Sequence, residues 1–193
     1  MKFKRIIAYI IDFFIITLIA SIIFTLPCFQ KNNTTYEENV ENYIKAIQNT
    51  EITEEELIDT EYNLYKSSSS LLIIRVIVII LYLGVLGYLK NGQTLGKKIC
   101  KIQIVPNKGK NLKPGLFMLR EMIVGNVFLE LISLIGLICC SKNTWQIIAT
   151  ITSDINLMIN LILLLSMIFD NNERALHDKI FGTKIIKKEK NMI

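Results

Sequence analysis

The sequence predicts an all-α membrane protein with about four transmembrane helices, and three observations support this. Hydrophobic residues make up 51% of the 193-residue chain, and its mean hydropathy is +0.41. That is more apolar surface than a soluble domain of this length easily buries. Four apolar runs each have the roughly 20 residues that a bilayer core requires. Lysine and arginine are concentrated at particular ends of these runs, which is typical of multi-pass proteins.

The chain reads as a single membrane domain, 1–193, with its four runs at 6–26, 71–89, 116–140 and 147–169. The first run exceeds the apolar core of a cleaved signal peptide, so we expect it to remain as a span. The third run is interrupted by Arg120, Glu121 and Glu130. An interfacial or re-entrant segment tolerates such charges better than a full span does, so this run is the least regular of the four.

The charges beside the runs predict that both termini are cytoplasmic. Segment 90–115 carries seven lysines and no acidic residue, and three basic residues precede the first run. Because positive charge is enriched on the cytoplasmic side, we expect these segments and the basic tail, 170–193, to lie inside the cell. There they would contact anionic lipid. Segment 27–70 has three lysines against nine acidic residues and is expected outside.

The external acidic insert, 27–70, is predicted to be largely helical. Thr53 and Glu56 have the spacing of a capping box that opens a helix. Apolar residues follow it at helical spacing, namely Leu57, Ile58, Tyr62 and Tyr65. Its acidic surface is most simply a solvated face. A mouth that collects cations and a surface that binds an external protein partner are the alternatives.

Two segments predict a small β-hairpin-like element on the cytoplasmic side. Segment 100–105 alternates apolar and polar residues and stops at Pro106, and Ile185 and Ile186 follow a similar glycine-containing segment in the tail. Such alternation is typical of a half-buried strand. We expect the two strands to pair beneath the helices and to hold His177 and Asp178 against the inner ends of the spans.

Asp12 is the first candidate functional residue, because a carboxylate inside an apolar span is costly and commonly functional. Arg5 lies seven positions earlier on the same helix face, too far away for a direct ion pair. We therefore expect Asp12 to pair with Arg120 or with a lysine of the cytoplasmic segment. Such a pair would either fix the packing of the helices or belong to a polar path.

The remaining polar residues of the spans fall at two levels, counting about 1.5 Å of rise per residue. Arg120, Glu121 and Asn160 share the inner level of Asp12, whereas Arg75, Glu130 and Asp154 fall together nearer the outer side. The outer three either form a charged cluster, or Arg75 extends to the headgroups while Glu130 marks a poorly inserted third segment. The sequence leaves both interpretations open.

Four motifs occur in order along nearly the whole chain. They are Arg5-x-x-Ala8-x-x-Ile11-Asp12, NGQTLGKK at 91–98, Arg120, and RALHDK at 174–179 followed by GTK at 182–184. In order, spacing and position relative to the runs, they resemble the RDD family of bacterial membrane proteins. The resemblance implies that Arg5, Asp12 and Asp178 are the arginine and two aspartates that name the family. It also implies a bacterial cell membrane and an activity that is undefined, with transport the common suggestion.

An enzyme, a cofactor and a catalytic site are not expected. The sequence has no phosphate-binding glycine loop, nucleophile elbow or zinc motif. His177 is the only histidine, so a metal site has little support. This histidine is either a structural hydrogen-bonding group or a group that titrates near neutral pH. Nucleic acid is not expected as a partner, because orientation and lipid contact already account for the lysines.

Two functions in different classes remain open. In the first, the protein is a small transporter or channel for cations or small solutes, and Asp12, Glu130 and Asp154 line its polar path. Four spans are few for a path within one subunit, so this function implies a homo-oligomer. In the second, the protein is a non-transporting scaffold or accessory protein whose external insert binds a partner. A polar cavity that joins Asp12 to the outer charges would favour transport, whereas tightly paired carboxylates without a cavity would count against it.

Overall fold

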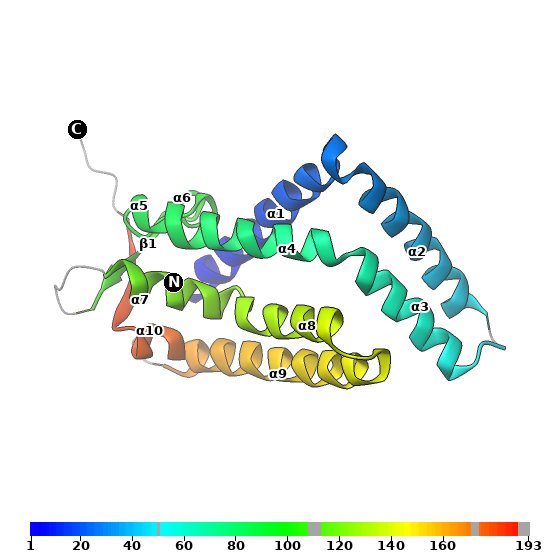
Figure 1. The fold of residues 1–193 in the computed structure, drawn as a ribbon. Helices are drawn as coiled ribbons and strands as arrows, with labels where there is room; N and C mark the ends of the chain where they lie inside the picture. The colour runs from blue at the N-terminus through cyan, green and yellow to red at the C-terminus, as the bar shows by residue number, and fades with distance from the viewer. Residues whose placement is uncertain (50, 108–112, 171–173, 189–193) are drawn as a thin grey trace.

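Three long helices in the computed structural model are apolar enough to cross a membrane (Figure 1), among the described residues 1–49, 51–107, 113–170 and 174–188. They are α1 (Lys2–Phe24), the continuous helix Ser69–Leu89, and α9 (Lys142–Phe169). The middle one consists of α4 (Ser69–Ile79), a π-helical segment η2 (Ile80–Leu86) and the short α5 (Gly87–Leu89). The all-α membrane class predicted from the sequence is therefore confirmed.

The third apolar run is a broken helix. It forms α7 (Pro114–Val124) and α8 (Val127–Cys139), which meet at 65°. Asn126 adopts a left-handed backbone conformation with φ 57°, which ends the first helix and redirects the chain. With this pair counted as one span, the described residues contain up to four spans. The sequence identified the run as the least regular but did not predict the position of the break.

The acidic insert forms a helical hairpin that projects from one end of the molecule (Figure 1). Its helices are α2 (Gln30–Gln48), preceded by a short 3-10 turn, η1 (Pro27–Phe29), and α3 (Glu54–Ser67). The predicted capping box is present: the Glu56 amide donates to Thr53 Oγ1 at 3.3 Å, and the Thr53 amide donates to the Glu56 carboxylate at 3.0 Å. Trp145 of α9 is 1% exposed and packs against Tyr62 and Tyr65 of α3, which fastens the insert to the helical core.

The two predicted strands pair at the opposite end, which we call the basic end. β1 (Ile102–Pro106) and β2 (Thr183–Lys187) are antiparallel, with Ile104 opposite Ile185. The strand begins at Ile102 rather than at residue 100, because the chain first forms α6 (Leu95–Ile99) and then turns through Lys101, whose φ is 56°. The short α10 (Leu176–Ile180) carries His177 and Asp178 against α7 and α9, as expected.

The helices α1 and α9 meet at the basic end and diverge toward the insert (Figure 1). At the meeting point, Lys2 Nζ donates to the Ile168 carbonyl at 2.7 Å. Beyond it, α1 packs on α4 through a buried face that includes Ile16, Ala20 and Phe24. The space between α1 and α9 contains the candidate site.

Candidate functional site

A buried ionic cluster at the basic end joins three separate helices through Asp178. The Asp178 side chain is 0% exposed and accepts from Arg5 of α1 and from Arg120 of α7. Arg120 Nη2 lies 2.6 Å from Asp178 Oδ1. Removing one member of a buried ion pair leaves an uncompensated charge, which is strongly destabilising. Arg5, Arg120 and Asp178 therefore hold α1, α7 and α10 together.

Neighbouring side chains complete the hydrogen bonding of this cluster. Glu121 is 1% exposed and accepts from Arg120 and from Lys97 Nζ, the latter at 3.0 Å. Thr183 of β2 accepts from Arg120 Nε and donates to Asp178 Oδ1, both at 3.2 Å. The sequence placed Arg120 and Glu121 at one level. It assigned no role here to Thr183, and Lys97 was only one of several lysines expected near Asp12.

His177 and Asp178 both have pKa values well below their ordinary ones. Burial favours the neutral form of the histidine, and the nearby positive charge of Arg120 adds to this, so the pKa of His177 falls to about 3. Burial alone would raise the pKa of Asp178, but the positive charges led by Arg120 outweigh it and lower that pKa. His177 is thus neutral at neutral pH and beside an ionised carboxylate. Its Nε2 lies 3.5 Å from Asp178 Oδ1, and its Nδ1 is buried without a hydrogen-bond partner among the described residues.

Asp12 forms a second site, in which its partners among the described residues are neutral. It is 3% exposed, and its carboxylate accepts from the Tyr82 hydroxyl at 2.6 Å, the Thr94 hydroxyl at 2.5 Å and the Gly96 amide at 2.8 Å. The expectation that Asp12 pairs with Arg120 or a lysine was wrong. Arg120 is instead committed to Asp178 and Glu121, and Lys97 to Glu121. The π-helical segment and the start of α6 supply the donors of Asp12.

Gly96 explains how α6 comes close enough to bind Asp12. A Cβ atom at this position would lie 2.4 Å from the Ala8 carbonyl oxygen and 2.8 Å from Asp12 Cγ, so no side chain fits. Thr94 contributes from the turn before α6, where its hydroxyl accepts from the Lys97 amide at 3.4 Å. The motif at 91–98 was recognised in the sequence. Its role as the hydrogen-bonding partner of Asp12 was not.

Nearer the insert, Arg75 of α4 and Glu130 of α8 form an ion pair. Asp154 does not join it. Asp154 is exposed on α9 and makes no ion pair or hydrogen bond within the described part of the chain. Side chains two positions apart in an α-helix point about 200° apart around its axis. Asp154 therefore faces away from the side on which Thr152, two positions earlier, is buried. Of the two interpretations that the sequence left open, the three-residue cluster does not form, and the outer charges meet as a pair of Arg75 and Glu130.

Three carboxamides lie between these charged groups. Asn126, at the break between α7 and α8, donates to Asn160 of α9 at 3.5 Å, and Asn160 donates to Asn156 at 2.6 Å. Asn160 was selected from the sequence by its level in the membrane. The other two were missed, although an asparagine next to glycine, as at 125–126, is a known signal for a left-handed turn.

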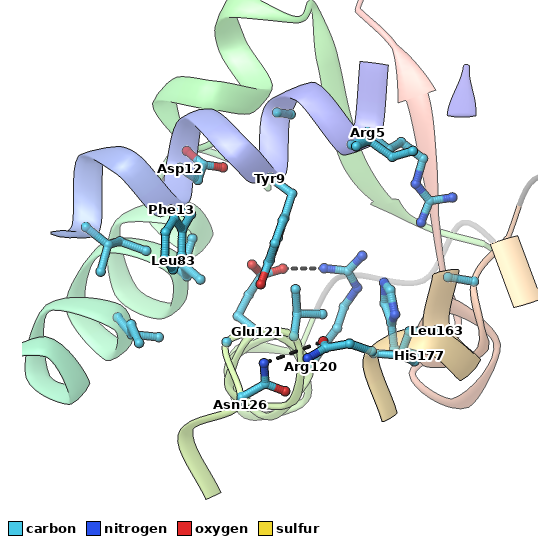
Figure 2. A pocket seen from close by; sticks show the side chains of 18 of the residues that line it. Arg5, Tyr9, Asp12, Phe13, Leu83, Arg120, Glu121, Asn126, Leu163 and His177 are labelled. Carbon is cyan, nitrogen blue, oxygen red and sulfur yellow. Dashed lines mark hydrogen bonds and ion pairs between the residues drawn. The ribbon is translucent and has the colours of Figure 1, made fainter. Parts of the chain in front are cut away.

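A cavity of about 490 Å³ connects the ionic cluster at the basic end to the Arg75 and Glu130 pair (Figure 2). Asp12, Arg120, Glu121 and His177 line it at the basic end, and Arg75 and Glu130 line it toward the insert. Tyr9 extends from α1 into the space between these groups (Figure 2). The predicted path included Asp12, Glu130 and Asp154, but Asp154 is not part of the cavity lining.

Comparison with known protein families decides which family this chain belongs to. The model of the RDD family matches residues 2–182, nearly the whole chain. The chain belongs to the RDD family. RDD proteins are membrane proteins, in agreement with the apolar helices. Searches of curated proteins and of solved structures returned no match.

The matched region of this RDD protein includes both buried sites. Arg5 and Asp178, the residues that the motifs assign to the family name, meet in the ionic cluster. Asp12, the other aspartate, lies in the separate hydrogen-bonded site. The three residues are therefore divided between two sites that border one cavity. Among the described residues, no group of three His, Cys, Asp or Glu side chains is placed to hold a metal ion.

Proposed function

We propose that this RDD protein is a small transporter or channel for cations or small solutes in a bacterial cell membrane. The cavity is the observation that carries the proposal, because it extends along the spans from the Arg120 and Glu121 pair to the Arg75 and Glu130 pair. Polar groups inside a membrane are costly and characteristically border a substrate path. Packing alone requires paired charges but does not require a cavity between them.

The active form in this proposal is a homo-oligomer. Only 6% of the apolar window of α9 is buried in the single chain. The described residues contain three helices long enough to span and one broken helix pair, which are few for a complete path. A second copy beside α9 would enclose the side on which α1 and α9 diverge.

The orientation proposed for the protein follows its charge. Both termini and the basic end face the cytoplasm, where their lysines contact anionic lipid. The acidic hairpin of α2 and α3 then projects outside the cell, where it is available to an external protein partner. No enzymatic reaction is part of this proposal.

A non-transporting scaffold is the second candidate, and the pairing of the buried charges favours it. Asp178, Arg120 and Glu121 are joined by ion pairs, and Asp12 accepts three hydrogen bonds. Groups satisfied in this way can act solely to hold helices together. In this function, the external insert would bind the partner protein and the cavity would have no substrate.

Reconstitution in proteoliposomes distinguishes the two candidates. Transport predicts flux of protons, monovalent cations or small solutes above that of protein-free vesicles, and a lower flux for Asp12→Asn. Glu130→Gln, at the other end of the cavity, provides a second variant should Asp12→Asn fail to fold. Asp154→Asn is the matched control, because this carboxylate lies outside the cavity lining. Flux equal to that of empty vesicles for every substrate tested would favour the scaffold.

A further inference from the structure

The charged groups around the cavity are balanced in number and, with one exception, paired with each other. The cavity and its ionic cluster include four basic residues, Arg5, Arg75, Lys97 and Arg120, and four acidic residues, Asp12, Asp178, Glu121 and Glu130. The exception is Asp12, whose carboxylate already accepts three hydrogen bonds from neutral donors. Although Glu130 Oε2 and Arg75 Nε lack a hydrogen-bond partner among the described residues, their charges already compensate each other. An entering ion would therefore meet charges that are largely compensated and would recover little of its own desolvation cost.

Several hydrogen-bonding groups of the cavity lining have no partner among the described residues. Arg75 Nε and Glu130 Oε2 belong to charges that already compensate each other, and the remaining groups, including the buried His177 Nδ1, are neutral. The Tyr9 hydroxyl has no hydrogen-bond partner among the described residues, and Tyr9 is 44% exposed. Asn126 uses only its amide nitrogen, and half-buried Asn156 uses only its amide oxygen. The cavity thus offers a hydroxyl, a free carbonyl oxygen and a free amide N–H. Such groups need water or a ligand when they lie at membrane depth.

These groups lie within the thickness of the bilayer. Tyr9 is seven residues from the start of α1, about 10 Å along the helix. Asn156 is thirteen residues from the end of α9, about 20 Å along that helix. Apolar side chains surround them, among them Phe13, Leu83 and Leu163 (Figure 2). An apolar wall with a few convergent polar groups is the usual form of a site for a small organic ligand.

We infer that the cavity binds a small uncharged molecule with both hydrogen-bond donors and acceptors, such as a polyol or a simple amide. Its recognition groups are Tyr9, Asn126 and Asn156. An uncharged molecule loses less hydration free energy than an ion on entering this apolar enclosure, and it leaves the ion pairs intact. The inference rests on the proposed transport function and specifies its substrate class, selecting small solutes over cations.

The test measures uncharged solutes and ions in the same preparation. Proteoliposomes holding the full-length chain are mixed with glycerol or urea, and solute entry is followed by stopped-flow light scattering. Proton and potassium fluxes are measured with dyes trapped in the same vesicles. We expect glycerol or urea to enter faster than into protein-free vesicles, while the ion fluxes stay at the protein-free level.

Two variants test the assigned groups, and only the second removes a hydrogen bond within the protein, the one that Asn156 accepts from Asn160. Tyr9→Phe removes a hydroxyl that bonds to no described residue, and Asn156→Leu replaces the amide with an apolar group of similar size. We expect each to slow solute entry about fivefold or more, the effect of losing one buried hydrogen bond. Leu157→Ala is the matched control, because Leu157 is the next residue of α9, is 63% exposed and lies outside the cavity lining.

The possible results separate the substrate class from the transport function. Ion flux without glycerol or urea entry would overturn the uncharged-substrate inference and leave transport in place. Absence of both would overturn both. Solute entry that is equally fast in wild type, Tyr9→Phe and Asn156→Leu would overturn the assignment of the site to this cavity.

Discussion

Asp12 and Asp178 are both buried aspartates, yet they are stabilised in different ways. Asp178 neutralises the guanidinium groups of Arg5 and Arg120, so its charge is part of a compact ionic cluster. Asp12 keeps its place through three neutral donors. The same residue type therefore serves as a counter-ion in one site and as a hydrogen-bond acceptor in the other.

Asp178→Asn should be severely destabilising, because two buried guanidinium groups would lose their shared carboxylate. We expect the free energy of unfolding in detergent to fall by about 3 to 5 kcal/mol, as for other broken buried ion pairs. Denaturant unfolding followed by circular dichroism measures it. Asp154→Asn makes the same chemical change at an exposed position and should cause no loss. Equal stability of the two variants would contradict the role of Asp178 as a counter-ion.

Acidification should destabilise the protein through His177 and then Asp178. The folded pKa of His177, about 3, lies below its ordinary value of 6.5. The folded state therefore binds fewer protons than the unfolded state in this range, and stability is lost as the pH falls from 6.5 toward 3, by at most about 1.4 kcal/mol per pH unit. Asp178, with a pKa lowered from 3.8, adds a loss below about pH 4.

A stability profile of His177→Gln tests this assignment. Glutamine does not titrate, so the variant should show a shallower pH dependence than the wild type between pH 6.5 and 4. Both curves should fall below about pH 4, where protonation of Asp178 takes over. Identical slopes in the upper range would show that other groups cause the acid sensitivity.

At the scale of elements, the contact of α6 with α1 determines the Asp12 site. The helix pattern of 6–26 was sufficient to predict α1, and the alternation in 100–105 was sufficient to predict a strand near β1. Neither pattern indicated that Leu95–Ile99 would form a helix resting on Ala8 and Asp12. That contact depends on how closely two backbones approach, which local periodicity does not describe.

Gly96→Ala should separate α6 from α1. The added methyl group would lie 2.4 Å from the Ala8 carbonyl oxygen, so the helices must move apart and the Gly96 amide must leave Asp12. We expect a loss of about 1 to 3 kcal/mol in the free energy of unfolding, as for other overpacked sites. Gly115→Ala is the control, because a Cβ at Gly115 meets no atom within 4 Å. A wild-type thermal midpoint for Gly96→Ala would contradict the close packing.

At the scale of the whole molecule, the insert and the sheet mark opposite ends of the helical body (Figure 1). The acidic hairpin of α2 and α3 lies at one end, and β1, β2 and α10 lie at the other. This polarity matches the distribution of charge in the sequence, which predicts the basic end inside the cell. The cavity extends from the basic end to the Arg75 and Glu130 pair, so the orientation determines which side each charged site faces.

Labelling of single cysteines by a membrane-impermeant maleimide tests this orientation. In a variant that retains only Cys28, which is exposed at the start of the insert, the thiol should react in intact cells. In a cysteine-free background, Lys187→Cys on the exposed part of β2 should react only after the cells are permeabilised. The reverse pattern would place the termini outside.

Much of this architecture follows from the sequence alone. Apolar runs of bilayer length indicate the spans, because crossing a membrane requires a local composition that can be read directly. The capping box at Thr53 and the alternation before Pro106 are likewise local signals, and the order of the motifs was sufficient to indicate the RDD family. The resemblance that these motifs carry also implied that Arg5, Asp12 and Asp178 belong to one set.

Only the tertiary structure decided which of these groups meet. These contacts depend on the rotation of each helix about its axis. They are the ion pairs of Asp178 with Arg5 and Arg120, the hydrogen bond of Asp12 with Tyr82, and the ion pair of Arg75 with Glu130, from which Asp154 is excluded. The break at Gly125 and Asn126 and the divergence of α1 from α9 then leave the cavity between them. Counting residues along a span gives depth in the membrane, but the facing of side chains is set by packing between helices.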